Sequence, residues 1–397
     1  VIVVFKGILT TISLLSSPSS LTSIITHQLF NKNSSLNMEY RRFGNTGLKV
    51  SRLGFGCMTF DTLDQTLELL EKARSYGCNF FDGAEAYGNP RGNCEKLFGD
   101  AYEILRNRDP IKWRRSDLVI TTKLYFGPSK DVKGVPFGYF GENELGSSFK
   151  HIQEGIDGAL KRCKLDYFDV VYSHRFDDVT PVEEQVRAFT KLIRDGKAFY
   201  WGTSMWPVSR IIEAYWIAKV NNLIPPIVEQ CQYSMFKRDY VENVYLPVFD
   251  NRYNIATTIW GALDSGILTG KYLNGAPKGS RMHKDSRLAA FYEKIPQWKH
   301  DKIRKLKDLA ENKLNTTVTS LAMAWCLKNE NTTVIILGAK NAKQLSATFE
   351  CYEVLKRLDD KIMKEIEDIL QNKPVLDPSL FNSWGRQKRN VRERSML

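Results

Sequence analysis

Short apolar runs alternate eight times with longer segments of helical periodicity along this chain of 397 residues. Parallel strands need a long crossover between them, and a helix is the usual crossover. Eight such units are the number that closes a strand–helix barrel. The predicted strands are, in order, 53–60, 79–85 (NFFDGAE), 117–124 (DLVITTKL), 167–174 (YFDVVYSH), 197–204 (KAFYWGTS), 226–232 (PIVEQCQ), 254–262 (NIATTIWGA) and 332–340 (TTVIILGAK).

The helical periodicity is clearest after the first predicted strand. Leu63, Leu67, Leu70 and Ala73 recur at spacings of three or four residues, and Gly77 then ends the pattern. The competing architecture, an open doubly wound sheet, usually carries GxGxxG after its first strand. Here that position reads LGFGCMTF, which lacks the third glycine. We therefore expect an α/β fold of the (β/α)8 TIM-barrel class, with a helix after each strand.

The barrel is expected to occupy residues 38–374. Residues 1–37 hold no acid, and their apolar run ILTTISLL is too short and too interrupted for a stable membrane span. We expect this segment to be an extension that is disordered or outside the native fold, either translated upstream sequence or a targeting remnant. Residues 375–397 are expected to form a basic tail.

The net charge of +12 favours anionic partners in general. Part of that excess lies in the two ends, and no basic patch is interleaved with aromatic residues in the way that single-strand binding requires. We therefore expect no nucleic-acid partner.

Seven cysteines, an odd number with no CxxC pair, argue against a disulfide framework and against a metal site. A reducing compartment, the cytoplasm, is the simplest expectation. Organelle targeting by the N-terminal segment, or peroxisomal targeting by the C-terminal tripeptide Ser395-Met396-Leu397, stays open.

Polar or amphipathic side chains stand at or just after the ends of the predicted strands. Active sites of such barrels lie at the carboxyl ends of the strands, where these side chains would form a ring. The ring consists of Asp82, Tyr87, Lys123, His174, Ser204, Gln230 and Trp260.

The residue types in this ring suit proton donation to a carbonyl oxygen. A tyrosine gives up its proton with difficulty near neutral pH, and a nearby ammonium such as Lys123 favours the phenolate. Asp82 would hold the lysine charged and in place, and His174 would orient an oxygen or share the proton transfer. The set lacks an electron source, which a hydride-carrying cofactor stacked on Trp260 would supply.

Motifs along the chain resemble those of the aldo-keto reductases, and most of all the branch that contains the β-subunits of voltage-gated potassium channels. The resemblance runs in order from about Tyr40 to about Pro374. The motifs that carry it are FDGAEAYGNPRGNCEKLFG, VITTKL, DVVYSHRFDDVTPVEE, LIRDGKAFYWGTSMW, NLIPPIVEQCQYSMF, SGILTGKY and LAMAWCLKNENTTVIILGAKNAKQL.

The resemblance implies a catalytic tetrad of Asp82, Tyr87, Lys123 and His174. Tyr87 would be the general acid and His174 would position the carbonyl. It also implies NADPH as the cofactor, with its nicotinamide on Trp260, its carboxamide bonded by Ser204 and Gln230, and its pyrophosphate covered by the loop 264–271. The 2'-phosphate would be gripped by Arg281 and Lys340. Further implied cofactor contacts are Gly56, Cys57, Met58, Gly261, Leu263, Ser265, Gly266, Lys271, Gly338 and Gln344.

Two functions stay open. The first is NADPH-dependent reduction of an aldehyde or ketone, a small carbonyl substrate, for which loop aromatics at Trp113, Phe126, Trp206 and Trp298 offer an apolar pocket. The second is an NADPH-binding regulatory β-subunit that assembles as a homo-oligomer on a membrane channel. The resemblance implies Asn in channel subunits where this chain has His174, which favours the reductase.

Overall fold

The structure is a computed structural model that describes residues 38–128, 141–278, 280 and 294–375. The expected extension 1–37 and all but the first residue of the expected tail lie outside the described residues, so the domain bounds stay a prediction.

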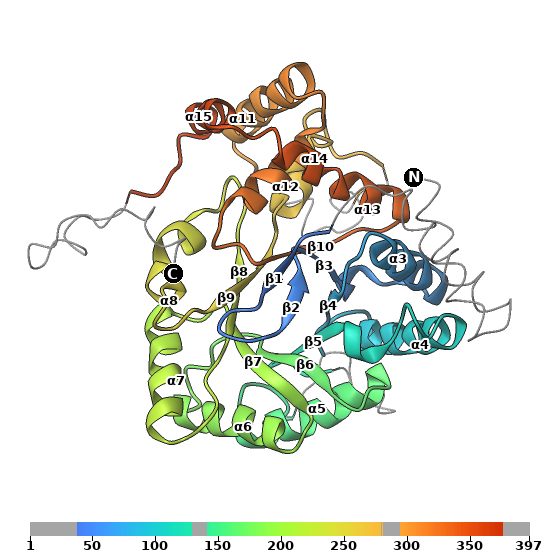
Figure 1. The fold of residues 1–397 in the computed structure, drawn as a ribbon, viewed down its shortest axis with the longest axis vertical. Helices are drawn as coiled ribbons and strands as arrows, with labels where there is room; N and C mark the ends of the chain where they lie inside the picture. Colours follow the sequence, from blue (N-terminus) through green and yellow to red (C-terminus); the bar gives the residue numbers. More distant parts are fainter. Residues whose placement is uncertain (1–37, 129–140, 279, 281–293, 376–397) are drawn as a thin grey trace, which may run out of the picture. The chain divides into compact units, whose positions relative to one another are not determined.

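Eight parallel strands close into a barrel in which spatial order follows chain order and the last strand pairs with the first (Figure 1). This confirms the (β/α)8 barrel. The strands are β3 (Leu53–Gly56), β4 (Phe80–Asp82), β5 (Val119–Leu124), β6 (Phe168–Ser173), β7 (Ala198–Ser204), β8 (Val228–Gln232), β9 (Ala256–Trp260) and β10 (Val334–Leu337).

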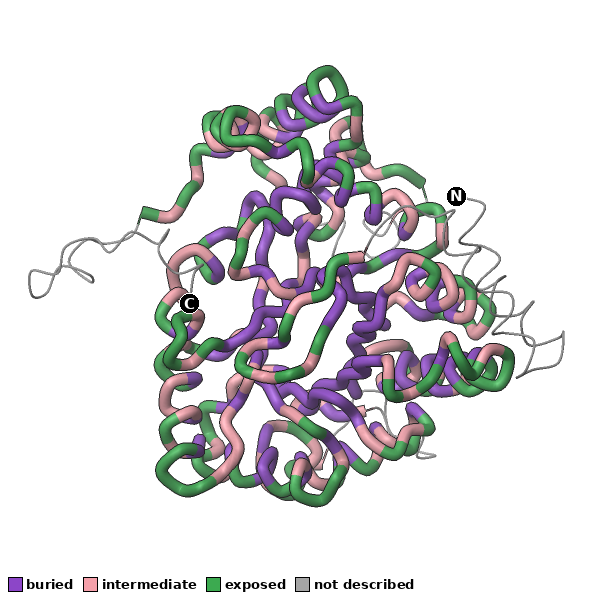
Figure 2. Tube along the Cα trace, in the orientation of Figure 1, coloured by how far each residue is buried: buried purple, intermediate pink, exposed green. Residues whose placement is uncertain are grey.

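Helices surround the barrel, and burial is concentrated along the strands and on the helix faces that touch them (Figure 2). In α6, for example, Val186, Phe189 and Leu192 are buried while Arg187 and Lys191 are exposed. The helices are α3 (Leu63–Ser75), α4 (Asn93–Arg108), α5 (Phe149–Cys163), α6 (Val182–Arg194), α7 (Val208–Val220), α8 (Leu246–Phe249), α11 (Gln297–Asp308), α12 (Val318–Lys328), α13 (Ala342–Phe349), α14 (Cys351–Leu355) and α15 (Asp360–Leu370).

Two local expectations were wrong. The first predicted strand, 53–60, ends at Gly56, because Cys57–Thr59 turn into the short 3-10 segment η1. No regular α-helix of ordinary length follows β8 directly; the chain forms the π-helical turn η3 (Tyr240–Val244) and then the short α8. Pro247 lacks an N–H and so cannot extend η3 into one continuous α-helix.

An antiparallel hairpin of β1 (Tyr40–Arg42) and β2 (Lys49–Ser51) lies across one end of the barrel (Figure 1). Between these strands, Phe43 is fully buried and its ring centroid lies 5.8 Å from that of Phe80. Val50 joins the same core cluster, whose other members include the first residues of several barrel strands. The hairpin therefore closes the amino end of the barrel and leaves the carboxyl end for a site.

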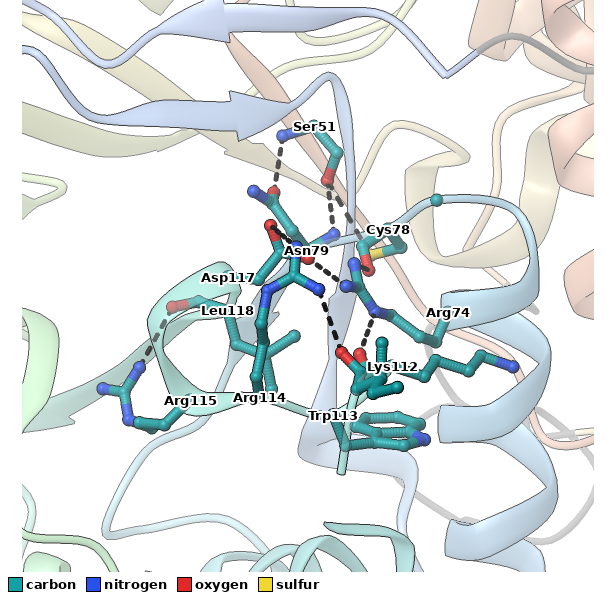
Figure 3. Close-up of polar contacts among 12 residues, drawn as sticks. Ser51, Arg74, Cys78, Asn79, Lys112, Trp113, Arg114, Arg115, Asp117 and Leu118 are labelled. Carbon is teal, nitrogen blue, oxygen red and sulfur yellow. Dashed lines mark hydrogen bonds and ion pairs between the residues drawn. The ribbon is translucent and has the colours of Figure 1, made fainter. Parts of the chain in front are cut away.

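A polar cluster at the amino end ties α3, the hairpin and the segment before β5 together (Figure 3). Arg74 on α3 donates to the backbone carbonyl of Lys112 and forms an ion pair with Asp117. Asn79 and Ser51 bond reciprocally, since the Ser51 N–H donates to Asn79 Oδ1 at 2.8 Å and the Asn79 N–H donates to Ser51 Oγ at 3.1 Å. These contacts hold the residues just before β4 and β5 in place. Polar networks at the amino end of such a barrel contribute to stability.

Replacing Asn79 with Ala is expected to lower the free energy of unfolding by about 1 to 3 kcal/mol, because the buried Ser51 N–H loses its acceptor. The Lys49 carbonyl also loses its bond from Asn79 Nδ2. Urea unfolding measures the change. Asn107→Ala, at an exposed position of α4, is the matched control. Equal stability of the two variants would contradict a structural role for this cluster.

Candidate active site

The barrel brings the predicted ring of side chains to its carboxyl end. Because the strands are parallel and closed, their last residues all face that end. Asp82 ends β4, Lys123 is next to last in β5, His174 follows β6, Ser204 ends β7, Gln230 lies in β8 and Trp260 ends β9.

Asp82 and Lys123 form a fully buried ion pair. Lys123 Nζ donates to Asp82 Oδ2 at 2.5 Å and to the Gly83 carbonyl at 2.7 Å. Asp82 Oδ1 accepts from Thr121 Oγ1 at 2.9 Å and from Gln230 Nε2 at 3.1 Å. The carboxylate is thus held by an ammonium, a hydroxyl and an amide, which is the pairing that a buried charge requires.

Burial lowers the pKa of Lys123, but the interactions of its ammonium with Asp82 and Tyr87 raise it more, so that its pKa lies above the ordinary value. The side chain is therefore an ammonium at neutral pH.

Tyr87 lies beside this ammonium, with Lys123 Nζ 4.7 Å from the ring centroid. Burial raises the pKa of Tyr87, Lys123 opposes the rise, and the net pKa lies above the ordinary value. From the sequence we expected Lys123 to lower this pKa; its charge does act in that direction, but burial outweighs it. The phenol therefore keeps its proton at neutral pH, and Lys123 is placed to stabilise the phenolate that proton donation leaves.

His174 is buried next to Tyr87, and the two rings meet edge-on at a centroid distance of 5.7 Å. Burial lowers the pKa of His174 well below its ordinary value, and Lys123 and Arg175 lower it further. The imidazole is therefore neutral, with one N–H donor and one acceptor nitrogen. Its buried Nδ1 has no hydrogen-bond partner in the described parts of the chain.

Sequence reasoning missed Arg175, which links the ends of β6 and β7. Its Nη1 donates to the His174 carbonyl at 2.5 Å and to Ser204 Oγ at 3.4 Å. It also missed Thr121, although Thr121 and Lys123 are two residues apart on β5 and so share a strand face. The two-residue repeat of a strand was the sequence signal for Thr121. The signal for Arg175 was its position next to His174.

The predicted cofactor residues continue around the same end of the barrel. Ser204 and Gln230 are register partners on β7 and β8, and Trp260 is partly exposed one strand further on. In the next loop, Ser265 and Lys271 are exposed. The loop contains Gly261, Leu263, Ser265, Gly266 and Lys271, and its segment η4 (Asp264–Thr269) includes left-handed backbone.

The remaining predicted cofactor residues lie after β10 and β3, which are neighbours in the closed barrel. Gly338, Lys340 and Gln344 are exposed around the start of α13, where the Asn341 side chain caps the helix by accepting from the Gln344 N–H at 2.9 Å. Gly56 and Met58 flank the end of β3. Arg281 lies outside the described residues.

Two hollows in the described part of the chain are lined by residues outside the tetrad. The buried side chain of Cys57 lines a cavity of about 10 Å³ beside Glu95 and Cys163. A cleft of about 370 Å³ lies at the amino end, beside Arg41 and Arg42. The side chains suited to the expected chemistry lie at the carboxyl end of the barrel instead.

The four loop aromatics do not all line a pocket. Trp113 is buried against Phe81 in the barrel wall, with ring centroids 6.1 Å apart, so its assignment to a substrate pocket was wrong. Phe126 meets the His174 ring edge-on at 5.0 Å and stays a pocket candidate. Trp206 is buried and donates to Ser173 Oγ at 3.3 Å. Trp298 is half-exposed on α11.

All seven cysteines are free and buried. Burial raises the pKa of Cys57 and of Cys231 well above the ordinary thiol value, so neither is a reactive thiolate at neutral pH. In the described part of the chain, no cluster of three metal-ligating side chains occurs. Likewise, none of the helices in the described ranges has the length and apolar character needed to cross a membrane.

Glu229, which sequence reasoning also missed, is fully buried beside Gln230. Its carboxyl oxygens accept from Thr203 Oγ1 at 2.6 Å and from the Met205 N–H at 2.5 Å, and the latter holds Met205 in a left-handed conformation. Burial raises the pKa of Glu229 to about 8, although these hydrogen bonds oppose the rise. The folded protein therefore keeps this carboxyl protonated at neutral pH, whereas the unfolded chain ionises it.

The stability that this bound proton contributes is complete below about pH 4.5 and is lost as pH rises through 8. Between pH 4.5 and 8, the free energy of unfolding of the native protein is expected to fall by about 1.4 kcal/mol per pH unit because of this group. Glu229→Gln, which mimics the protonated carboxyl, is expected to lack that fall. Urea unfolding at several pH values measures the slope, with Glu68→Gln at an exposed position of α3 as the control. Parallel pH profiles for the native protein and Glu229→Gln would contradict the buried-proton account.

A sequence profile of the aldo/keto reductase family matches residues 52–371. The chain belongs to the aldo/keto reductase family. It is also 40% identical over 342 residues to proteins of Oryza sativa subsp. japonica and Arabidopsis thaliana, each described as "Probable voltage-gated potassium channel subunit beta". Each match covers 85% of this chain and 98% of the relative. The resemblance to aldo-keto reductases of the channel-subunit branch is thereby confirmed, and with it a place among oxidoreductases.

Proposed function

We propose that this aldo/keto reductase uses NADPH to reduce an aldehyde or ketone, with Tyr87 as the general acid. The observation that carries the proposal is the buried Asp82–Lys123 pair, which meets a protonated Tyr87 and a neutral His174 at the carboxyl end of the barrel. These side chains form a proton-donating set next to residues suited to a nicotinamide cofactor.

The residues present fit such a cofactor. The buried Nδ1 of His174 has no partner among the described side chains and backbone, as expected where a bound molecule completes the set. Ser204 and Gln230 offer a hydroxyl and an amide for a carboxamide, and Trp260 offers a partly exposed ring. Lys271 and Lys340 are exposed cations suited to phosphates. Arg281 is proposed for the 2'-phosphate on the sequence resemblance alone.

When bound, NADPH supplies a hydride, and so two electrons, to the carbonyl carbon. His174 would donate its N–H to the carbonyl oxygen and fix its orientation. Tyr87 would give its proton to that oxygen as negative charge develops there, so that the product is an alcohol. Lys123 would stabilise the resulting phenolate, and Asp82 would keep Lys123 in place and charged.

Two measurements on the purified chain test this proposal. Quenching of tryptophan fluorescence on titration with NADPH is expected, since Trp260 would lie against the cofactor. Consumption of NADPH is expected with 4-nitrobenzaldehyde and with other apolar aldehydes. Binding without consumption of NADPH across a broad aldehyde panel would count against a reductase.

The identity with the plant relatives favours a second proposal, that the chain is an NADPH-binding β-subunit of a voltage-gated potassium channel with slow oxidoreductase activity. Such a subunit would act as a homo-oligomer on a membrane channel. Light scattering at micromolar concentration tests for the homo-oligomer. A monomer would count against assembly on a channel. Both proposals place the protein in the cytoplasm, where seven free cysteines stay reduced.

A further inference from the structure

Glu85 follows the end of β4, and its side chain is fully buried. Its Oε1 accepts from the Tyr125 N–H at 2.6 Å and from the Gly127 N–H at 2.9 Å. His151 Nε2 on α5 lies 3.3 Å from the same oxygen, and the Glu85 N–H donates to the Lys123 carbonyl at 3.2 Å. Glu85 therefore bonds the end of β5 and the loop directly after it at alternate residues.

The other carboxyl oxygen of Glu85, Oε2, is buried and has no hydrogen-bond partner within the described ranges. A buried polar atom without a partner lowers stability, so this side chain is an inefficient way to hold the fold together. What its bonds do provide is a fixed place for the backbone that they reach.

A second side chain from the same segment holds the peptide between those two N–H groups. Arg91 Nη1 donates to the Phe126 carbonyl at 2.9 Å. The Tyr125 carbonyl accepts from the Gly146 N–H at 2.8 Å. Residues 125–127 are thus bonded at every position, and three of the four bonds come from Glu85 and Arg91. The loop therefore keeps a fixed position relative to the segment 85–91, which also carries Tyr87.

Phe126, at the centre of this loop, packs against His174. The two rings meet edge-on at a centroid distance of 5.0 Å, and Tyr87 meets the same imidazole edge-on at 5.7 Å. A histidine that acts on a substrate commonly has its orientation set by a hydrogen bond to its other ring nitrogen. The described residues supply no such bond to His174 Nδ1. Packing against the two rings therefore takes over that role.

We propose that Glu85 is a positioning residue for carbonyl reduction. By fixing residues 125–127 it keeps the Phe126 ring against His174, and so keeps the imidazole oriented toward the substrate oxygen. This inference rests on the proposed function. Because Glu85 acts through Phe126 and His174 alone, its loss slows the chemical step and leaves cofactor binding intact.

Three variants of the full-length chain separate this role from a general loss of stability. Glu85→Ala removes the acceptor of both loop N–H groups, whereas Glu85→Gln keeps an oxygen at that place. Phe126→Leu keeps an apolar side chain and removes the ring. The matched control is Glu95→Ala on α4, which removes an equally buried carboxyl that bonds Thr122 and Arg162 and does not touch residues 125–127.

The first readout is amide hydrogen exchange at residues 125 and 127, and the second is kcat with 4-nitrobenzaldehyde and with propanal, a small aliphatic aldehyde. Glu85→Ala is expected to exchange faster and to lower kcat about tenfold for both aldehydes, the effect of weakening one hydrogen bond to the reacting oxygen. Glu85→Gln is expected to retain most of kcat. Adding Phe126→Leu to Glu85→Ala is expected to cause no further loss, because both changes act through the same contact.

Native kcat in Glu85→Ala would overturn the proposal, as would additive losses in the double variant or an equal loss in Glu95→Ala. A loss confined to 4-nitrobenzaldehyde would also overturn it, because Phe126 would then serve as a substrate wall and not as a support for His174. If Glu85→Ala does not fold, Glu85→Asp decides the question, since its shorter side chain is expected to lose at least one of the two loop bonds.

Failure of the proposed function gives a different result. A native chain that binds NADPH and reduces neither aldehyde would refute that function, and the positioning role with it. Native reduction of both aldehydes that is unaffected by Glu85→Ala would refute the positioning role alone.

Discussion

Tyr87→Phe is expected to lower kcat for aldehyde reduction by about 100- to 10,000-fold, the usual contribution of a general acid. Phe keeps the ring beside Lys123 and His174, so packing is retained while the proton donor is lost. The carbonyl oxygen would then have to gain its proton from water. Affinity for NADPH is expected to stay within a factor of about two, because the hydroxyl donates only to the developing alkoxide.

Initial rates of NADPH oxidation measure this effect. Tyr215→Phe on α7 is the matched control, because it removes a phenol that bonds the Arg252 carbonyl on the outer layer of the protein. If Tyr87→Phe keeps native kcat, the proton has another source and the role of Tyr87 is wrong.

Lys123→Met is expected to destabilise the fold by about 3 to 5 kcal/mol in addition to abolishing activity, because it leaves the buried Asp82 charge without its cation. Thr121 and Gln230 still donate to that carboxylate, but neither carries a charge. Adding Asp82→Asn to Lys123→Met is expected to recover most of the stability, since no unpaired charge then remains.

Urea unfolding of the native chain, the single variant and the double variant forms the test. Activity is expected to stay absent in the double variant, which separates the structural role of the pair from its catalytic role. A double variant less stable than Lys123→Met alone would contradict the ion-pair account.

Much of the fold could be predicted from the sequence because the barrel strands are short, largely apolar runs that alternate with segments of helical periodicity. The run Val119–Leu124 is fully buried, as the residues VITTKL predicted. The hairpin β1–β2 could not be predicted, because strands of three residues are too short to show a period. The interruption after β8 did have a signal in the sequence, Pro247, but the sequence does not show that the preceding residues form a π-helical turn.

The site was predictable as far as position at a strand end determines it, which covers Asp82, Lys123 and His174. What a side chain touches across the barrel was not predictable. Glu229 reads as an ordinary strand residue, and only its complete burial raises its pKa to about 8. For the same reason, the direction of the Tyr87 pKa depended on how strongly burial opposes Lys123, which spacing in the sequence does not reveal.

The most direct test of the central claim uses NADPH that carries deuterium at the transferable position of its nicotinamide. With 4-nitrobenzaldehyde and the native chain, we expect the alcohol to carry deuterium on the former carbonyl carbon, and we expect Tyr87→Phe to form that product far more slowly. Alcohol without deuterium, or no alcohol from a chain that has bound NADPH, would contradict carbonyl reduction at this site.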